Sequence, residues 1–402
     1  MPFSKIAAEN YVPSSANKPR VAVRPYNEGR DKAAVEELEQ RCEVGQPGKP
    51  SLVTDLMGDP IARVRNFISH IMLVAEYGDG REIVGVIRGC IKTATSGKRS
   101  PSPIYVKLAY ILGLRVSSTH RRLGIAIKLV QELEEWCKKN GAEYAYMATE
   151  CSNQASLNLF TQKCNYVKFR NPTVLVQPVH LHHKQLPSDI TIVQLPPTLA
   201  ESVYRKLFSA GSEFFPKDID RLLSNKLNLG TFMALPKNLL PNWDPNTGEL
   251  PASFAILSVW DTKEVFRLRV KGVSSLTHAA CLGTRVVDAM APWLKIPSIP
   301  NIFKNFGFYF MYGLHMEGQG GPRLLKVLCK MVHNMARNDS RCRVVVAEVG
   351  QNDPVREAIP HWKKFSWDED IWCIKRFGQI KQDYHEFPVS SSSPIFVDPR
   401  DL

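Results

Sequence analysis

Apolar positions along this chain of 402 residues alternate between the strand and helix periods in a fixed order. In the first half, the order predicts a strand, a helix, a two-stranded hairpin, a long central strand, a helix, a strand, a short helix and a last strand. These elements are expected at residues 21–24, 31–42, 71–75 with 83–87, 106–116, 124–139, 144–149, 153–163 and 166–176. Residues 1–20 have no such periodicity, and we expect them to be disordered.

The same order of elements returns in the second half of the chain, after a linker at residues 177–188. The repeated elements are expected at residues 190–193, 199–208, 231–235, 254–260, 308–315, 324–335, 344–347 and 371–374. Gly313 follows Gly113 by 200 residues, and Asn352 follows Asn153 by 199. The preserved order predicts two copies of one fold, at residues 21–176 and 189–378, followed by a tail at residues 379–402.

Composition narrows the class of protein. With 44% hydrophobic and 23% charged residues, the chain is typical of a globular protein. It has no apolar run that could span a membrane, and residues 1–20 show no apolar h-region, so we do not expect export. Its nine scattered cysteines indicate a reducing compartment, nucleus or cytoplasm. The net charge of +13 suits an anionic cofactor; without a recognisable motif, direct nucleic-acid binding is not expected. No metal site is expected, because His180, His182 and His183 have no acidic or thiol partner nearby.

The most informative segment joins the long central strand to the amphipathic helix after it. It contains Arg121-x-x-Gly124-x-Ala126. A helix N-terminus offers unpaired amides and partial positive charge, and small residues let an anion approach them. The segment therefore predicts a pyrophosphate site, and the alternative is an ordinary strand-to-helix turn whose small residues serve packing.

These residues resemble motif A of the GNAT superfamily of N-acetyltransferases, with the pattern Q/R-x-x-G-x-G/A. Residues 153–166 resemble its motif B, N-x-x-A-x-x-L-Y-x-K-x-G-F. The two motifs at this separation cover residues 21–176. Nearly the whole chain is also similar to the plant Hookless-type N-acetyltransferases, most clearly at residues 41–45, 56–60, 87–93, 372–376 and 395–400.

The resemblance implies an α/β (α+β) fold of two tandem GNAT-like domains, the second degenerate. Each is a mixed, mostly antiparallel twisted sheet flanked by helices. Acetyl-CoA is the implied co-substrate, bound where the fourth and fifth strands part. The residues implied to bind it are Leu114 and Val116 through their backbone, Arg121, Arg122, Leu123, Gly124, Ile125, Ala126 and Ile127 through their amides, and Asn153 and Phe160 beside the pantetheine arm.

The implied acceptor is an amine of a protein or peptide, histone lysine among them, in plant growth and hormone response. A lysine side chain, a protein N-terminus and a small amine all remain compatible, as does a homo-oligomer. The alternative function is a catalytically weak acetyl-CoA-binding regulatory or scaffold protein. It is motivated by Phe160, which stands where the family commonly has a proton-donating tyrosine.

The catalytic groups are less defined than the cofactor site. Glu150 is the candidate base, with a capping or solvent-facing carboxylate as the alternative. Tyr166 is the first candidate donor, and Tyr110, Tyr144, Tyr146 or water are the others. In the second copy, Pro322 removes an amide from the corresponding turn, so weaker or absent cofactor binding is expected. The acidic residues expected to line a groove for a basic peptide are Glu348, Asp368, Glu369 and Asp370.

Overall fold

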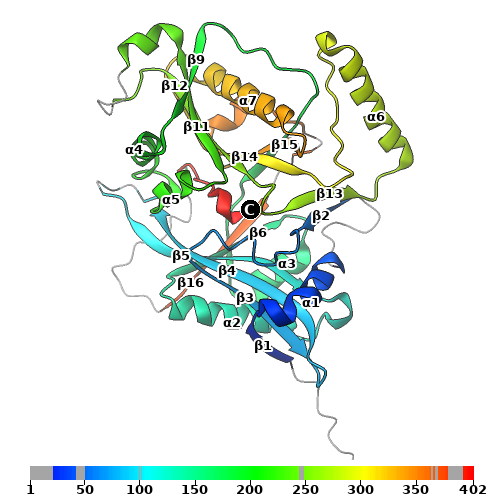
Figure 1. The fold of residues 1–402 in the computed structure, drawn as a ribbon. Coiled ribbons are helices and arrows are strands. Elements are labelled where there is room, and N and C mark those ends of the chain that lie inside the picture. The colour runs from blue at the N-terminus through cyan, green and yellow to red at the C-terminus, as the bar shows by residue number, and fades with distance from the viewer. Residues whose placement is uncertain are drawn as a thin grey trace, which may run out of the picture.

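Two β-sheets lie one above the other in the computed structural model, with a large apolar core between them (Figure 1). The structure describes residues 21–41, 50–98, 100, 102–243, 249–363, 365–366, 370–378 and 393–402. The expected disordered N-terminus and part of the expected tail lie outside these residues. Within them, no helix is long and apolar enough to cross a membrane.

The first sheet contains mostly strands from the first half of the chain. In spatial order these are β1 (Val21–Pro25), β3 (Ser69–Tyr77), β4 (Glu82–Ser96), β5 (Tyr105–Val116), β6 (Tyr144–Glu150), β16 (Asp370–Arg376) and β7 (Val167–Arg170). Among the described strands of this sheet, only β5 and β6 pair in parallel. The helices of this half are α1 (Glu28–Arg41), α2 (Ile125–Lys139) and α3 (Gln154–Asn158). The apolar stripe of α2 covers the outer face of the sheet, as its helical period predicts.

The second sheet repeats this architecture. In spatial order its strands are β8 (Thr173–Pro178), β15 (Cys342–Val349), β14 (Gly307–Glu317), β12 (Phe254–Asp261), β11 (Asn228–Pro236) and β9 (Ile190–Leu195). Its helices are α4 (Pro197–Phe208), α5 (Ile219–Leu223), α6 (Ser275–Met290) and α7 (Gly321–Asn338). Two short strands, β2 (Ser51–Asp55) and β13 (Arg267–Lys271), pair with each other, and β10 (Glu213–Pro216) pairs with β4. The expected fold class, two tandem GNAT-like units, is confirmed.

The two halves exchange strands, which the sequence did not predict. β16, from the end of the chain, lies between β6 and β7 in the first sheet, and β8 leaves the first half to pair with β15. The single strand expected at residues 166–176 is wrong. Asn171 and Pro172 separate β7 from β8, and Pro172 has no amide to continue a strand ladder. The sheets therefore do not follow the expected boundaries at residues 176 and 189.

The segment expected to be a polar linker is partly buried. His182 Nδ1 lies 2.9 Å from Asp288 Oδ1, and His180 Nδ1 lies 2.8 Å from the carbonyl oxygen of Ser298. Both histidines are buried. Their partners come from residues more than 100 positions away, so local sequence gave no sign of them.

The last ten residues also differ from the expected tail. They lie in the centre of the molecule, between the two sheets (Figure 1). Phe396 and Val397 are buried in the core that the halves share. They are followed by a short helical turn, Pro399–Asp401, which is buried as well.

Candidate active site

The central parallel strands of the first sheet separate before they end. β5 and β6 pair from Leu108 and Tyr144 only as far as Ile111 and Met147, although β5 continues to Val116 and β6 to Glu150. On its other side, β5 shifts register against β4. Beyond Ile111 and Met147 the two strands are no longer paired, and we call this unpaired stretch between them the gap; the resemblance implies such a separation.

Gly113 makes the irregularity possible. Its φ of +62° favours glycine, and a Cβ atom there would lie 2.6 Å from Nη1 of Arg88. Arg88 is 1% exposed and is held in place by an ion pair of 2.8 Å with Glu39 and a bond of 2.6 Å to the carbonyl oxygen of Pro60. The buried guanidinium therefore occupies the space that a side chain at position 113 would need.

The turn after β5 presents open backbone donors. The His120 amide donates to the Ser117 carbonyl, and the Lys128 amide donates to the Gly124 carbonyl. Between them, the amides of residues 121–127 have no acceptor among the described residues. Gly124 has a φ of +81° and open space on its Cβ side. The four residues before the helix are exposed: Arg121, Arg122, Leu123 and Gly124.

The amides of this turn are thus unpaired and the space in front of Gly124 is open, as a pyrophosphate site requires. Ile125, Ala126 and Ile127 form the first turn of α2, directly behind it. Leu114 and Val116 lie in the part of β5 that has separated from β6. These placements agree with the predicted roles, and the roles themselves stay predictions.

The residues of motif B follow β6. Asn153 caps α3, where its side chain accepts a bond of 3.2 Å from the Ser156 amide. The chain then widens into a π-type turn, Leu159–Lys163, closed by the Cys164 amide and the Leu159 carbonyl. Phe160 in this turn is 2% exposed, and its ring meets that of Tyr166 edge to face, with 5.1 Å between ring centroids.

Tyr166 lies on the α2 side of the first sheet, within the core that α2 covers. Burial, together with the negative charge of Glu134 on α2, raises the pKa of Tyr166 well above its usual value. Lys375 pairs with Glu134 at 2.6 Å and lies over the Tyr166 ring. Tyr166 therefore keeps its proton at neutral pH, and its role as donor stays a prediction.

Glu150, the candidate base, is the last residue of β6 and lies opposite Asp370 on β16. Burial, and then the charge of Glu150, raise the pKa of Asp370 to about 6. Glu348 on β15 accepts a bond of 3.1 Å from the indole of Trp372, which lies on β16 close to Asp370. Two of the four acidic residues expected along a groove are thus close together, and Asp368 and Glu369 lie outside the described residues.

Sequence reasoning named Tyr110 and Tyr146 as alternative donors but missed the two charged residues beside them, Lys92 and Asp401. The Tyr146 hydroxyl donates to Asp401 at 2.7 Å, and Lys92 Nζ donates to the same oxygen at 2.6 Å. Tyr110 stacks on Tyr146, with 4.7 Å between ring centroids, one position before the last paired residues of β5 and β6. Asp401 is 309 residues from Lys92 along the chain, so no local pattern marks the pair.

The second half has a shorter turn at the corresponding place. Gly320 precedes α7 with a φ of +84° and open space on its Cβ side, as Gly124 precedes α2. Only three residues, 318–320, separate β14 from α7, whereas eight, 117–124, separate β5 from α2. The Gly321 amide donates to the Gly318 carbonyl, and Pro322 has no amide. Fewer donors are therefore available for an anion.

A parallel strand pair that separates beside an open amide turn, with a helix starting at that turn, defines an acyl-CoA-dependent N-acyltransferase of the GNAT type. The chain belongs to the acetyltransferase (GNAT) family, whose pattern matches residues 33–166. It is 50% identical to "Probable N-acetyltransferase HLS1" of Arabidopsis thaliana, over 94% of this chain and 99% of that protein. It is 42% identical to "Acetyl transferase GW6a" of Oryza sativa subsp. japonica, over 95% of this chain and 97% of that one.

Among solved structures, the chain resembles Saccharomyces cerevisiae N-myristoyltransferase with bound myristoyl-CoA. The TM-score is 0.52 at 10% identity, over 89% of this chain and 79% of that one, which shows a common fold. The family and the relatives show that the protein is an acetyltransferase that acts on an amine acceptor, and the expected co-substrate, acetyl-CoA, is confirmed.

Proposed function

We propose that this enzyme transfers acetyl from acetyl-CoA to a primary amine of a protein or peptide, with histone lysine among the candidates, in the gap between β5 and β6. The observation that carries the proposal is this gap, which has the open amides of residues 121–127 at its end. On the β6 side of the gap lie the carboxyl groups of Glu150, Asp370 and Glu348. Such groups favour a cationic acceptor.

The proposed cofactor site is built from backbone groups. The amides of residues 121–127 bind the diphosphate, and the side chains of Arg121 and Arg122 add positive charge. Leu114 and Val116 offer their backbone to the pantetheine arm, and Asn153 and Phe160 flank it. The arrangement leaves the thioester between the separated strands, where an amine can reach its carbonyl carbon.

The proposed chemistry is direct attack by the amine. Glu150 accepts a proton from the acceptor ammonium, and the neutral amine then bonds to the thioester carbon as the carbon–sulfur bond breaks. Tyr166 gives its proton to the departing thiolate and regains one from the nitrogen, which loses its second proton as the amide forms. Tyr166 is protonated at neutral pH, as a donor must be, while burial and the charge of Glu134 raise its pKa and make it a weaker acid.

A matched pair of substitutions tests the proposal. Gly124→Glu places a negative side chain where the diphosphate binds, and Gly320→Glu places it at the equivalent turn of the second half; both glycines have positive φ and open space. We expect Gly124→Glu to abolish acetyl-CoA binding and thiol release with a lysine peptide or a polyamine. Gly320→Glu, with the same backbone strain, should retain both. Equal loss in both variants, or none in Gly124→Glu, would contradict the proposed site.

The same assay distinguishes the proposed enzyme from the second candidate function, a regulatory or scaffold protein that binds acetyl-CoA. Phe160 cannot donate a proton, which favours a protein that binds acetyl-CoA with little turnover. Tight binding of acetyl-CoA without thiol release to any amine would support that regulatory or scaffold role.

We also propose that the protein acts in plant growth and hormone response, in the nucleus or cytoplasm. The likeness to Hookless-type proteins and the dispersed cysteines support this. A fluorescent fusion found outside both compartments would refute the location.

A further inference from the structure

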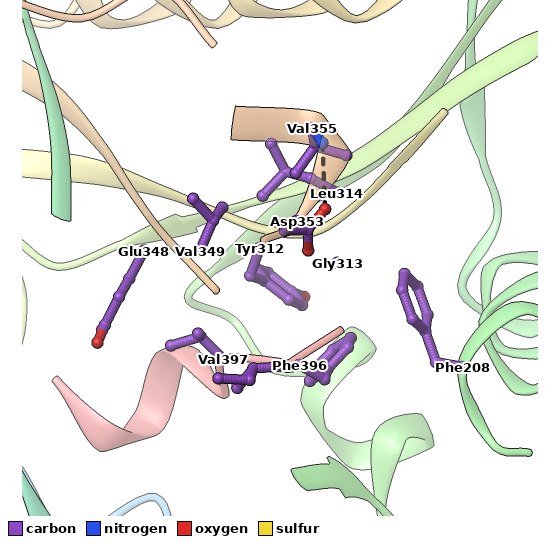
Figure 2. A pocket seen from close by; sticks show the side chains of 11 residues that line it. Phe208, Tyr312, Gly313, Leu314, Glu348, Val349, Asp353, Val355, Phe396 and Val397 are labelled. Carbon is purple, nitrogen blue, oxygen red and sulfur yellow. Dashed lines mark hydrogen bonds between the residues drawn. The ribbon is translucent and has the colours of Figure 1, made fainter. Parts of the chain in front are cut away.

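The second half leaves little open space where its own central strands separate. β14 and β15 pair only up to Met311 and Ala347, as β5 and β6 pair only up to Ile111 and Met147. Side chains close most of the space just beyond, and the pocket that remains beside Tyr312, about 20 Å³, can hold one water molecule (Figure 2). The apolar surface of this half that lacks a partner among the described residues lies on the outside, along α6.

The helix α6, Ser275–Met290, lies at the edge of the molecule and belongs to none of its apolar cores (Figure 1). Only Cys281 and Asp288 among its residues are buried. It lies within residues 262–306, which join β12 to β14, whereas residues 97–104 join the corresponding strands β4 and β5. The repeated fold can therefore be built without this helix.

One side of α6 is fastened to the protein. Asp288 Oδ1 lies 2.9 Å from Nδ1 of the buried His182. The ring of His278 stacks on that of Phe303, with 3.7 Å between ring centroids. Because positions 278, 281 and 288 share one side of a helix, these contacts fix its orientation and leave the opposite side facing solvent.

The outward face of α6 is apolar and uncharged. It consists of seven exposed residues: Leu276, Ala279, Ala280, Gly283, Val286, Val287 and Met290. The two residues of α6 that carry a formal charge at neutral pH, Arg285 and Asp288, lie on the fastened side. A helix face of this composition is typical of a surface that another protein covers.

The exposed area is sufficient for a stable dimer. Leu276 is 84% exposed, Met290 74%, and Trp293, in the turn that follows the helix, 72%. At about 200 Å² for each fully exposed large apolar side chain, the seven such side chains at residues 276–294 expose on the order of 800 Å². Each partner in a standard protein–protein interface buries about 800 Å².

The outward face of α6 is also complementary to itself. Gly283 lies at the middle of the helix. If two copies of α6 lie antiparallel and cross there, Leu276 of one copy opposes Met290 of the other, and the two alanines of one copy oppose the two valines of the other. Small residues then meet larger ones, and one patch serves on both chains, as two-fold symmetry requires.

Gly283 has no role within a single chain that its surroundings explain. A Cβ atom added there would have no neighbour within 4 Å among the described residues. Glycine weakens the interior of a helix relative to alanine. A missing side chain at a crossing point instead lets two helices approach closely, so that the larger side chains on either side of it come into contact.

We propose that α6 is the interface through which two copies of this chain associate, with the two helices antiparallel and crossing at Gly283. A membrane surface fits this face less well, because helices that lie on membranes flank their apolar face with Lys and Arg, and Arg285 alone represents these residues in α6. The inference goes beyond the proposed function and does not depend on it, since no residue of α6 belongs to the acetyl-CoA site.

Sedimentation velocity of the full chain over a range of concentrations measures the association. We expect the wild type to form a dimer that dissociates on dilution. Leu276→Glu should raise the Kd at least about a hundredfold, because two-fold symmetry repeats the loss of a buried leucine. The control is Ile68→Glu, at an apolar side chain outside α6 that is 72% exposed, and it should leave the Kd unchanged.

A pair of opposite charges tests the antiparallel arrangement. Met290→Lys alone should weaken the dimer as Leu276→Glu does. Combining both substitutions in one chain should restore most of the affinity, because each introduced carboxylate then meets the introduced ammonium of the other copy. A double variant as weak as the single variants would overturn the proposed pairing.

Gly283→Leu tests the crossing point. It should raise the Kd at least about tenfold, because a side chain at the crossing forces the two helices apart. A non-specific apolar patch would respond in the opposite direction, since leucine adds apolar surface and favours a helix more than glycine does. Tighter association of Gly283→Leu would therefore overturn the inference.

The wild type alone can also overturn the inference, by remaining monomeric at every concentration. Vesicles of phosphatidylcholine and phosphatidylserine test the membrane as a different occupant. A monomeric wild type that binds these vesicles, with binding lost in Leu276→Glu, would assign the face to lipid instead. Circular dichroism checks that each variant keeps its fold, which we expect because the substituted side chains are exposed.

Discussion

Lys92 joins the first sheet to the C-terminal segment through buried ion pairs. Its ammonium, 1% exposed, lies 2.6 Å from Asp401 Oδ2 and 3.6 Å from Asp398 Oδ2. Tyr146 donates to the same oxygen of Asp401. Substituting Lys92→Met keeps a side chain of similar length and removes the charge, so it tests the ion pairs rather than the packing.

The expected loss of stability in Lys92→Met depends on the contacts that Asp398 and Asp401 keep. Asp398 keeps Arg400, whose guanidinium contacts both of its carboxylate oxygens at 3.0 and 2.8 Å. Asp401 loses its cation and stays buried. Removing one partner of a buried pair costs about 3–5 kcal/mol. We expect about 3 kcal/mol, the lower end, because the Tyr146 hydroxyl still donates to Asp401.

The loss of stability in Lys92→Met should depend on pH. Burial already raises the pKa of Asp401 in the wild type, and without Lys92 the pKa rises further. A carboxyl group whose pKa is higher in the folded state than in the unfolded state binds extra protons when folded, so it costs stability as pH rises. The difference between Lys92→Met and wild type should therefore be larger at pH 8 than at pH 5.

Urea unfolding followed by tryptophan fluorescence at both pH values measures this difference. The control is Lys138→Met, which removes an exposed pair with Glu135 and should cause no measurable loss. A loss below about 1 kcal/mol for Lys92→Met, or one independent of pH, would refute the assigned role of the buried pair.

Two further substitutions test the gap and the proton donor. Gly113→Ala should lower the free energy of unfolding by about 2–4 kcal/mol and lower kcat, because the new Cβ atom would displace Arg88 from Glu39. The control is Gly141→Ala, where φ is +78° and the nearest neighbour of the new Cβ atom lies at 3.4 Å, so that only about 1 kcal/mol of backbone strain is expected. Equal losses of stability in urea unfolding of the two variants would contradict this reasoning. Tyr166→Phe should lower kcat about tenfold while the calorimetric affinity for acetyl-CoA stays constant, and an unchanged kcat would exclude Tyr166 as the donor.

The sequence by itself determined the local features. The periods of β5 and α2 and the small residues at Gly124 and Ala126 lie within one continuous segment, so their pattern predicted the strand, the open turn and the helix. The order of elements, repeated with Gly113 and Gly313 at corresponding bulges, predicted the duplicated fold. Each of these depends on neighbouring residues and on backbone conformation, which a sequence pattern expresses directly.

Only the tertiary structure decided which segments meet. Strand pairing uses backbone groups that every residue except proline carries, so nothing in the composition of β16 or β8 says which sheet it joins. The contacts of Lys92 with Asp401 and of Glu348 with Trp372 follow from that exchange and from the buried C-terminal segment. The sequence contains Lys92, Asp401 and Glu348, but the packing of the two sheets decided which partners they meet and how deeply they are buried.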